Sequence, residues 1–200
     1  PVKLAPYSKS MLDTYRNNVV SCLILSSSTA KGAYSVEPGN TMLYGLAPLP
    51  YATGLLPLLL DDEIHLEYLP PVKEAEKMSF SERNKLGFKL GLKKGIDFFF
   101  AVGSVTYYIS SSFAKMSGGG SKKGIKNVFQ YSPALIARYI SGKKKAAREG
   151  RSIAPKDVFR LRGFMCAGTD NRCYKDDLEK LWGIRPVEVF AGTEPGCLGC

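Results

Sequence analysis

The sequence predicts an α/β domain in which helices flank a layered, largely parallel sheet. Strand-like and helix-like stretches alternate along most of the 200 residues. The strand-like stretches are almost continuously apolar, as in IDFFFAV at residues 96–102, which is typical of parallel strands buried on both faces. Hydrophobic residues make up 44% of the chain, ample for a packed core. Without an internal repeat or clean boundary, residues 1–200 are expected to form one domain.

The first quarter of the chain predicts a helix and then a strand. Between Ser10 and Leu25, apolar side chains recur at the spacing of one helical face. Residues 41–47 (TMLYGLA) read as a buried strand that breaks at Pro48 and Pro50. The apolar stretch GLLPLLL then suggests a short helix, and HLEYL at 65–69 a second strand.

Local signals delimit the elements in the middle of the chain. Ser79 and Glu82 have the spacing of a capping box, which predicts a helix from Phe80 to about Leu92, closed by Gly95. After the strand at 96–102, Gly103 and Ser104 are expected to form a turn and an N-cap. The next helix is expected to bury one face, made of Val105, Tyr108, Ile109, Ser112, Phe113 and Met116.

The last third repeats the alternation. Ser132 and Pro133 predict the start of a short helix that ends before Gly142, although the lysines that follow could prolong it. Residues 159–167 (FRLRGFMCA) are strand-like, and 173–182 form a helical pattern that Gly183 stops. The strand PVEVF, at 186–190, is expected to be the last.

Charge and composition restrict the classes of protein to which the chain can belong. Twenty-eight Lys and Arg against 18 Asp and Glu give a net charge of +10, which favours anionic partners. The chain lacks an apolar run long enough for a membrane span and lacks a secretion signal. Five cysteines at wide spacing argue against a disulfide framework, so we expect a cytoplasmic protein with reduced thiols. The single histidine, His65, offers no catalytic pairing.

Three unusual loops are expected at one edge of the sheet. APLPYATG follows Leu46, AGTDN follows Cys166, and AGTEPG follows Phe190. Ligands of such folds bind beyond the carboxyl ends of the parallel strands, where these loops begin. We therefore expect the functional site there.

The three loops together resemble the adenylate-forming superfamily, the acyl-CoA synthetases and their relatives. The segment FAGTE (190–194) resembles the family's aromatic, glycine, threonine and glutamate signature. PLPYATG (48–54) is similar to its Pro-x-x-His-x-x-Gly segment, with Tyr51 where histidine is common. FMCAGTDNRCYKDDLEKLWGI resembles the strand, turn and helix that carry the adenine loop. The likeness is strongest to auxin-type acyl-acid amidosynthetases and phenylacetate-CoA ligase-like enzymes, over residues 159–196.

The resemblance implies that a carboxylic acid is activated by ATP as an acyl-adenylate and then passed to a thiol or amine. Thr193 would donate to the α-phosphate, and Glu194 would ligate Mg²⁺ through a hard oxygen. Phe190 would stack on adenine, and Gly192 would let the backbone approach the nucleotide. The adenine loop that faces them would consist of Gly168, Thr169 and Asp170.

The acyl pocket is expected at the ends of two strands that flank the final one. Its lining would be Tyr51, Gly54, Val102, Gly103 and Ser104.

Two family features have no counterpart in the sequence. The phosphate loop should precede the first helix, and SGGGSKKG at 117–124 comes too late in the chain. A C-terminal domain with a catalytic lysine should follow Cys200. We therefore expect part of a large N-terminal adenylation domain, inactive by itself.

Two other functions stay open. A nucleic-acid-binding module could use a lysine-rich surface without sequence preference, although no recognition motif accompanies it. The residues of this surface would be Lys122, Lys123, Lys126, Lys143, Lys144, Lys145, Arg148 and Arg151. Zinc could instead organise an interaction domain through Cys166, Cys173, Cys197 and Cys200, although their spacing is irregular.

Overall fold

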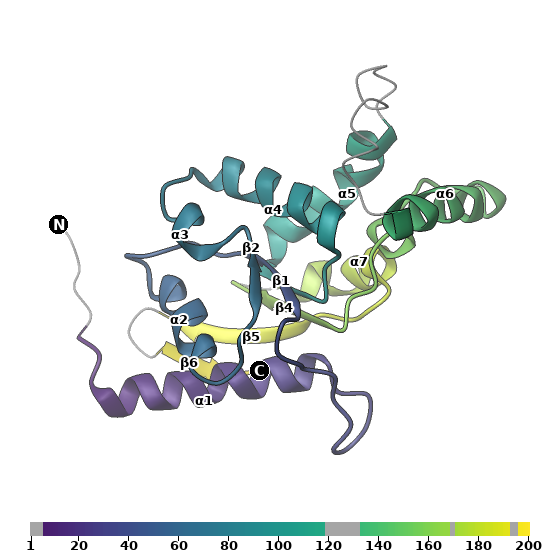
Figure 1. Cartoon of the computed structure of the whole chain (residues 1–200). Coiled ribbons are helices and arrows are strands. Elements are labelled where there is room, and N and C mark those ends of the chain that lie inside the picture. Colours follow the sequence, from purple (N-terminus) through teal and green to yellow (C-terminus); the bar gives the residue numbers. More distant parts are fainter. Residues whose placement is uncertain (1–5, 119–132, 169–170, 193–195) are drawn as a thin grey trace.

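In a computed structural model, the chain forms a six-stranded, mostly parallel sheet with helices on both faces (Figure 1). The structure describes residues 6–118, 133–168, 171–192 and 196–200. The strands are β1 (Thr41–Gly45), β2 (Glu67–Leu69), β3 (Phe98–Val102), β4 (Gly163–Ala167), β5 (Val187–Gly192) and β6 (Gly196–Gly199). The predicted α/β class, a largely parallel sheet flanked by helices, is confirmed.

The order of the strands across the sheet is β2-β1-β3-β4-β5-β6. The first five strands pair in parallel, and β6 pairs antiparallel with β5. The prediction that PVEVF forms the last strand is therefore wrong, because residues 196–199 form β6, which pairs antiparallel with β5. Antiparallel partners need only a short connection, unlike the helical crossovers that join the parallel strands.

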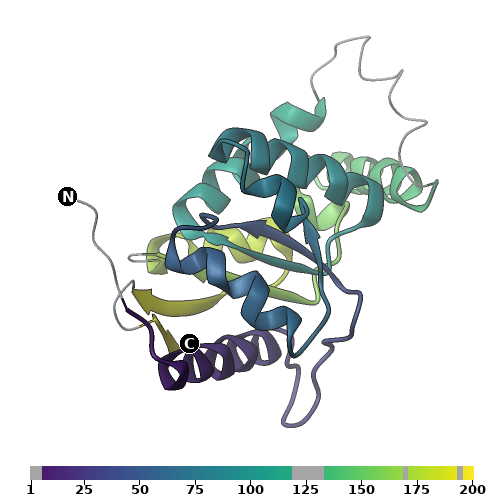
Figure 2. The ribbon, with the colours of Figure 1, turned by 60° about the vertical axis from the view of Figure 1, so that its left-hand side comes forward.

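One face of the sheet is covered by α1 (Lys9–Ser26) and α2 (Leu56–Asp61), which follows the 3-10 turn η1 (Ala52–Leu55). The predicted apolar face of α1 is buried, with Tyr15, Val19 and Leu23 at its centre. In Figures 1 and 2, α1 runs beneath the sheet, and β6 lies alongside it. Asn18 fastens this contact by donating a 2.7 Å hydrogen bond to the carbonyl oxygen of Cys197.

The opposite face is covered by the remaining long helices. They are α4 (Phe80–Lys94), α5 (Gly103–Gly118), α6 (Pro133–Arg148) and α7 (Arg172–Trp182). Short elements α3 (Val72–Ala75) and η3 (Pro155–Asp157) lie in the connections. Phe88, Phe113 and Trp182 pack in the core between these helices and the sheet. Figures 1 and 2 show α4 on the side of the sheet opposite to α1.

Strand β3 shows how the apolar run serves both layers. Phe98 and Phe100 belong to the core shared with α1, whereas Phe99 belongs to the core shared with α4 and α7. Successive side chains of a strand point to opposite faces, so a strand buried on both sides must be apolar at every position. The sequence of β3 is continuously apolar because both of its faces are buried.

Two local signals are confirmed at the atomic level. The Ser79 hydroxyl accepts from the backbone N–H of Glu82, whose carboxylate accepts from the N–H of Ser79 at 2.9 Å, so both halves of the capping box form. Gly183 ends α7 with a φ of 76°, a left-handed conformation that glycine adopts without strain.

The start and the buried face of α5 differ from the prediction. The helix begins at Gly103, directly after β3, so Gly103 and Ser104 form no separate turn. Its buried side chains include Thr106 and Ser110, whereas Tyr108, predicted to be buried, is 73% exposed. The cause is the neighbouring helix: α5 packs against α7, and Trp182 donates a hydrogen bond to Ser110.

Helix α6 continues past Gly142 to Arg148, so Gly142 is not a terminating residue. It is buried where α6 meets η3, and a Cβ there would lie 2.6 Å from the carbonyl oxygen of Asp157. Close packing of α6 against η3 therefore requires glycine at this position. The sequence pattern alone had indicated only that Gly142 ends a helix.

Candidate functional site

The loops that resemble the adenylate-forming family leave the sheet from one edge. Strands β1, β4 and β5 run in the same direction, so the segments after them begin at the carboxyl edge of the sheet. The expected shared edge is therefore confirmed, although the described residues reach only parts of two of the loops. Thr169, Asp170, Thr193 and Glu194 lie outside them.

The expectation that two strands carrying the acyl pocket flank β5 is wrong. Tyr51 and Gly54 follow β1, Val102 ends β3, and Gly103 and Ser104 follow it, but the neighbours of β5 are β4 and β6. With strands about 4.8 Å apart, the three spacings from β1 to β5 amount to about 14 Å. Strand β4 takes the place beside β5 because the single helix α7 connects the two.

The segments after β1 and β3 instead begin at a topological switch point. The chain leaves β1 for one outer strand, β2, and later proceeds from β3 in the other direction across the sheet. The first connection carries α2 on one face, and the return to β3 carries α4 on the other. In open α/β sheets such divergence opens a crevice at the strand ends. Tyr51 and Ser104, both exposed, belong to these two segments.

Gly103 is buried beneath the side chain of Asn171. A Cβ at Gly103 would lie only 2.0 Å from Asn171 Oδ1. Asn171, 4% exposed, donates from Nδ2 to the carbonyl oxygens of Cys166 and Gly168 at 3.4 and 3.3 Å. Asn171 thus holds the predicted adenine loop against the start of α5. Sequence reasoning missed this role, for which the only signal was an asparagine at the start of α7.

Gly168 opens the predicted adenine loop in a conformation that favours glycine. Its φ is 109°, and a Cβ would meet Val102 Cγ1 at 3.2 Å. Cys166, at the base of this loop, is fully buried, and burial with a smaller contribution from Glu188 raises the pKa of its thiol to about 12. This cysteine is a core side chain, with neither the exposure nor the acidity of a nucleophile.

Phe190 and Gly192 lie in the described part of the FAGTE segment. The side chain of Phe190 is 62% exposed, so its ring has an open face despite lying within β5. Phe190 is opposite Gly199 of β6, and the pairing shifts register immediately after it. Gly192 is paired with Gly196 at the other end of the two-strand ladder.

The segment between β1 and α2 is held by its own hydrogen bonds. Thr53 donates to the carbonyl oxygen of Ala47 at 2.7 Å, and Tyr44 donates to the carbonyl oxygen of Thr53. Gly54 is buried. A side chain does not fit there, because a Cβ would lie 2.0 Å from the backbone nitrogen of Leu49. Tyr51 is 65% exposed on the outside of this segment.

A pocket lies next to this segment, at the carboxyl ends of β1 and β2. It is lined by Tyr44, Leu46, Pro48, Leu49, Gly54, Pro57, Tyr68, Pro70, Val72, Ala75, Glu76 and Arg83. Gly54 alone of the predicted site residues lines it. Sequence reasoning missed Arg83, since an arginine in the first turns of a capped helix looks like an ordinary surface charge.

The cysteines are not arranged as the zinc interpretation requires. Within the described ranges, no group of three or more His, Cys, Asp or Glu side chains could hold a metal. Cys22 of α1 instead lies beside Cys197. The interaction between the two thiols raises the pKa of Cys22 and lowers the pKa of Cys197. All five cysteines are free of disulfides.

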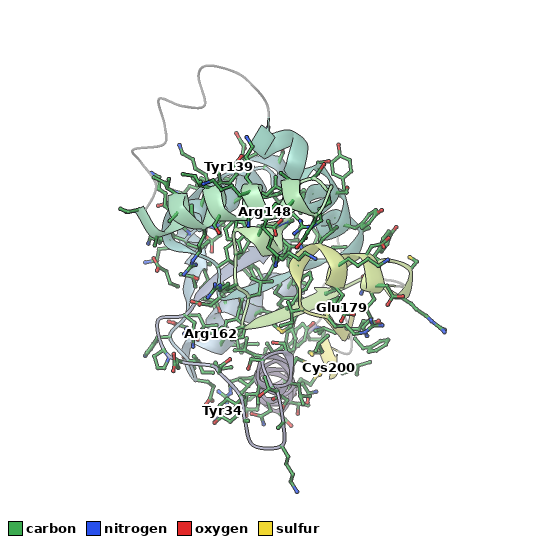
Figure 3. The ribbon with its side chains drawn as sticks, turned by 90° about the vertical axis from the view of Figure 1, so that its right-hand side faces the viewer. Tyr34, Tyr139, Arg148, Arg162, Glu179 and Cys200 are labelled. Carbon is green, nitrogen blue, oxygen red and sulfur yellow. The ribbon has the colours of Figure 1, made fainter. Side chains whose placement is uncertain are left out.

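The basic residues are divided between several environments. Lys144, Lys145 and Arg148 are exposed on α6. Figure 3 labels Arg148 on this helix. Arg151, by contrast, makes two hydrogen bonds to Asp157, at 2.7 and 2.8 Å. Lys122, Lys123 and Lys126 lie outside the described residues. In the parts described, none of the helices has the length and apolar character needed to cross a membrane.

Compared with protein-family models and with curated proteins, the chain matches none of them.

Proposed function

We propose that the chain belongs to an ATP-dependent ligase, which activates a carboxylic acid as its acyl-adenylate and then transfers the acyl group to a thiol or amine. The observation that carries the proposal is the FAGTE segment, which begins with an exposed aromatic ring at the carboxyl edge of a parallel sheet. The AGTDN and APLPYATG segments follow other strands of that sheet at the same edge.

The proposed reaction has two steps. A carboxylate oxygen of the acid attacks the α-phosphorus of ATP, the bond between the α-phosphorus and the bridging oxygen breaks, and pyrophosphate leaves. The thiol or amine then attacks the acyl carbon, loses its proton, and displaces AMP. Neither step needs an oxidant, so the protein contributes mainly positioning and charge stabilisation.

The residues are assigned to the nucleotide by their chemistry. The open face of the Phe190 ring is available for stacking on adenine. The Thr193 hydroxyl would donate to the α-phosphate, and Glu194 would ligate Mg²⁺, which offsets the charge of the departing pyrophosphate. Gly168, held by Asn171, would present the backbone of the adenine loop. Since none of the five cysteines forms a disulfide, a cytoplasmic location is part of the proposal.

Exchange of labelled pyrophosphate into ATP by the enzyme that contains this chain tests the proposal. We expect exchange that depends on a carboxylic acid from a panel of aromatic and aliphatic acids. Glu194→Gln should slow the exchange and raise the Mg²⁺ concentration that it requires. Glu188→Gln is the matched control, because Glu188 lies on β5 and pairs with Lys175 at 3.0 Å. Absence of acid-dependent exchange with every acid in the panel would refute the proposal.

A further inference from the structure

The pocket at the ends of β1 and β2 has apolar walls and a single cation. Leu46, Leu49, Pro57 and Val72 contribute apolar surface, and Arg83 is the only lysine or arginine among the lining residues. The space between these walls, counted together with the solvent at its open mouth, is about 360 Å³. The four sides come from the β1–α2 segment, β2, α3 and α4.

Arg83 is buried without a counterion. The residue is 5% exposed, and its side chain makes no hydrogen bond or ion pair with the described residues. Its Nε atom is fully enclosed and unpartnered. The guanidinium of Arg83 lies over the ring of Phe80, with Arg83 Cζ 5.6 Å from the ring centroid. A charge removed from water without a partner is among the most unfavourable arrangements in a folded protein.

The neighbouring polar groups do not neutralise this charge. The Tyr44 hydroxyl is committed to the carbonyl oxygen of Thr53, and that of Tyr68 lies 3.5 Å from the carbonyl oxygen of Pro57. Burial raises the pKa of Tyr44 well above its ordinary value, so its phenol stays neutral beside Arg83. Burial also lowers the pKa of Arg83, as expected for a cation that lacks a partner. The described residues therefore leave the positive charge of Arg83 without an anionic partner.

We propose that this pocket binds a small monocarboxylic acid, with its carboxylate on Arg83 and its apolar body against Leu46, Leu49 and Val72. A guanidinium presents two parallel N–H groups that match one carboxylate. The apolar walls favour an alkyl or aryl group over a polar one. The pocket has no second cation to stabilise a dianion such as phosphate, and Glu76 in its lining repels additional negative charge.

This site is separate from the proposed adenylation chemistry. Arg83 lies at the β1 and β2 end of the sheet, whereas the FAGTE segment follows β5, about 14 Å farther across the strands. A carboxylate held by Arg83 is therefore not the one that would attack ATP. Binding should need neither nucleotide nor Mg²⁺, so it can be measured whether or not the chain adenylates an acid.

Calorimetric titration of the 200-residue chain with benzoate, without ATP or Mg²⁺, tests the assignment. Benzamide is the neutral probe of the same shape. We expect benzoate to bind at least about tenfold more tightly than benzamide, because the neutral amide cannot form the charge-assisted pair with Arg83. Arg83→Met should weaken benzoate binding at least about tenfold while leaving benzamide unchanged. Arg148→Met, which removes an exposed arginine on α6, should bind benzoate as the wild type does.

The other outcomes are also decisive. Equal binding of benzoate and benzamide, or undiminished binding by a folded Arg83→Met variant, would overturn the proposal. Inorganic phosphate that displaced benzoate at equal concentration would show a general anion site and would also overturn it. If Arg83→Met does not fold, Glu76→Gln provides the test: removing the like charge should tighten benzoate binding by about twofold to fivefold. Unchanged or weaker binding by Glu76→Gln would count against the site.

Discussion

Trp182 donates its indole N–H to the hydroxyl of Ser110 at 2.8 Å, and this bond joins α7 to α5 inside the core. Both residues are almost fully buried. Ser110 in turn donates to the carbonyl oxygen of Thr106. Since the indole N–H can only donate, Ser110 is the group that makes a buried tryptophan acceptable at this position.

Ser110→Ala should therefore lower the free energy of unfolding by about 1–3 kcal/mol, because the indole N–H loses its acceptor in a dry environment. Urea unfolding followed by fluorescence reports the change directly, since Trp182 is the only tryptophan. Ser111→Ala is the control: its exposed hydroxyl bonds only to the carbonyl oxygen of Tyr108 in its own helix. Equal midpoints for the two variants would contradict the role of Ser110.

The Asp157 carboxylate should make stability depend on acid pH. Burial by itself would raise the pKa of Asp157, but hydrogen bonds from Arg151 and from the N–H of Ala154 hold that pKa below its ordinary value. A carboxyl group whose pKa is lower in the folded state stabilises the fold above its unfolded pKa of about 3.9. The contribution is lost as the pH falls through the folded-state pKa.

Asp157→Asn should lower the free energy of unfolding at pH 7 by about 1.5–3 kcal/mol, the range for charge-assisted hydrogen bonds. It should also flatten the fall in stability below about pH 4. Urea unfolding at several pH values measures both effects. Asp177→Asn, which removes an exposed ion pair with Lys180, should change stability by less than about 1 kcal/mol. A variant with the wild-type pH profile would show that Asp157 does not carry this dependence.

Thiol accessibility should divide the cysteines by position. Cys173 and Cys200 are exposed and should react rapidly with a maleimide in the native protein. Cys22 and Cys166 should react only after unfolding, because both are enclosed and the pKa of Cys166 is raised to about 12. Mass spectrometry of labelled peptides locates each adduct, and labelling in denaturant provides the full count. Rapid native labelling of Cys166 would show that the base of the adenine loop is open.

Phe190→Ala should weaken ATP binding to the enzyme by about 1–3 kcal/mol, the range of base stacking on an aromatic ring. The loss should appear with ATP and with AMP alike, since stacking involves the base. Tyr108→Ala removes an aromatic ring that is equally exposed but lies on α5, and should leave nucleotide affinity unchanged. Equal affinity of wild type and Phe190→Ala would remove this ring from the nucleotide site.

The shared edge of the three loops was predictable because loops follow directly from strand ends. Once β1, β4 and β5 are recognised as parallel strands, the segments after them must begin at one edge. The position of each loop along that edge was not predictable, because it depends on the order of the strands. Arg83 was likewise hidden, since its significance lies in a missing partner, which only coordinates reveal.

The sequence by itself determined the local structure of this protein. The apolar run of β3, the capping box at Ser79 and the stop at Gly183 depend on neighbours within a few residues, and each is confirmed. Only the tertiary structure decided the place of β4 beside β5, the buried face of α5 and the continuation of α6 through Gly142. These features depend on contacts between segments distant in the chain, whose packing overrides the local pattern.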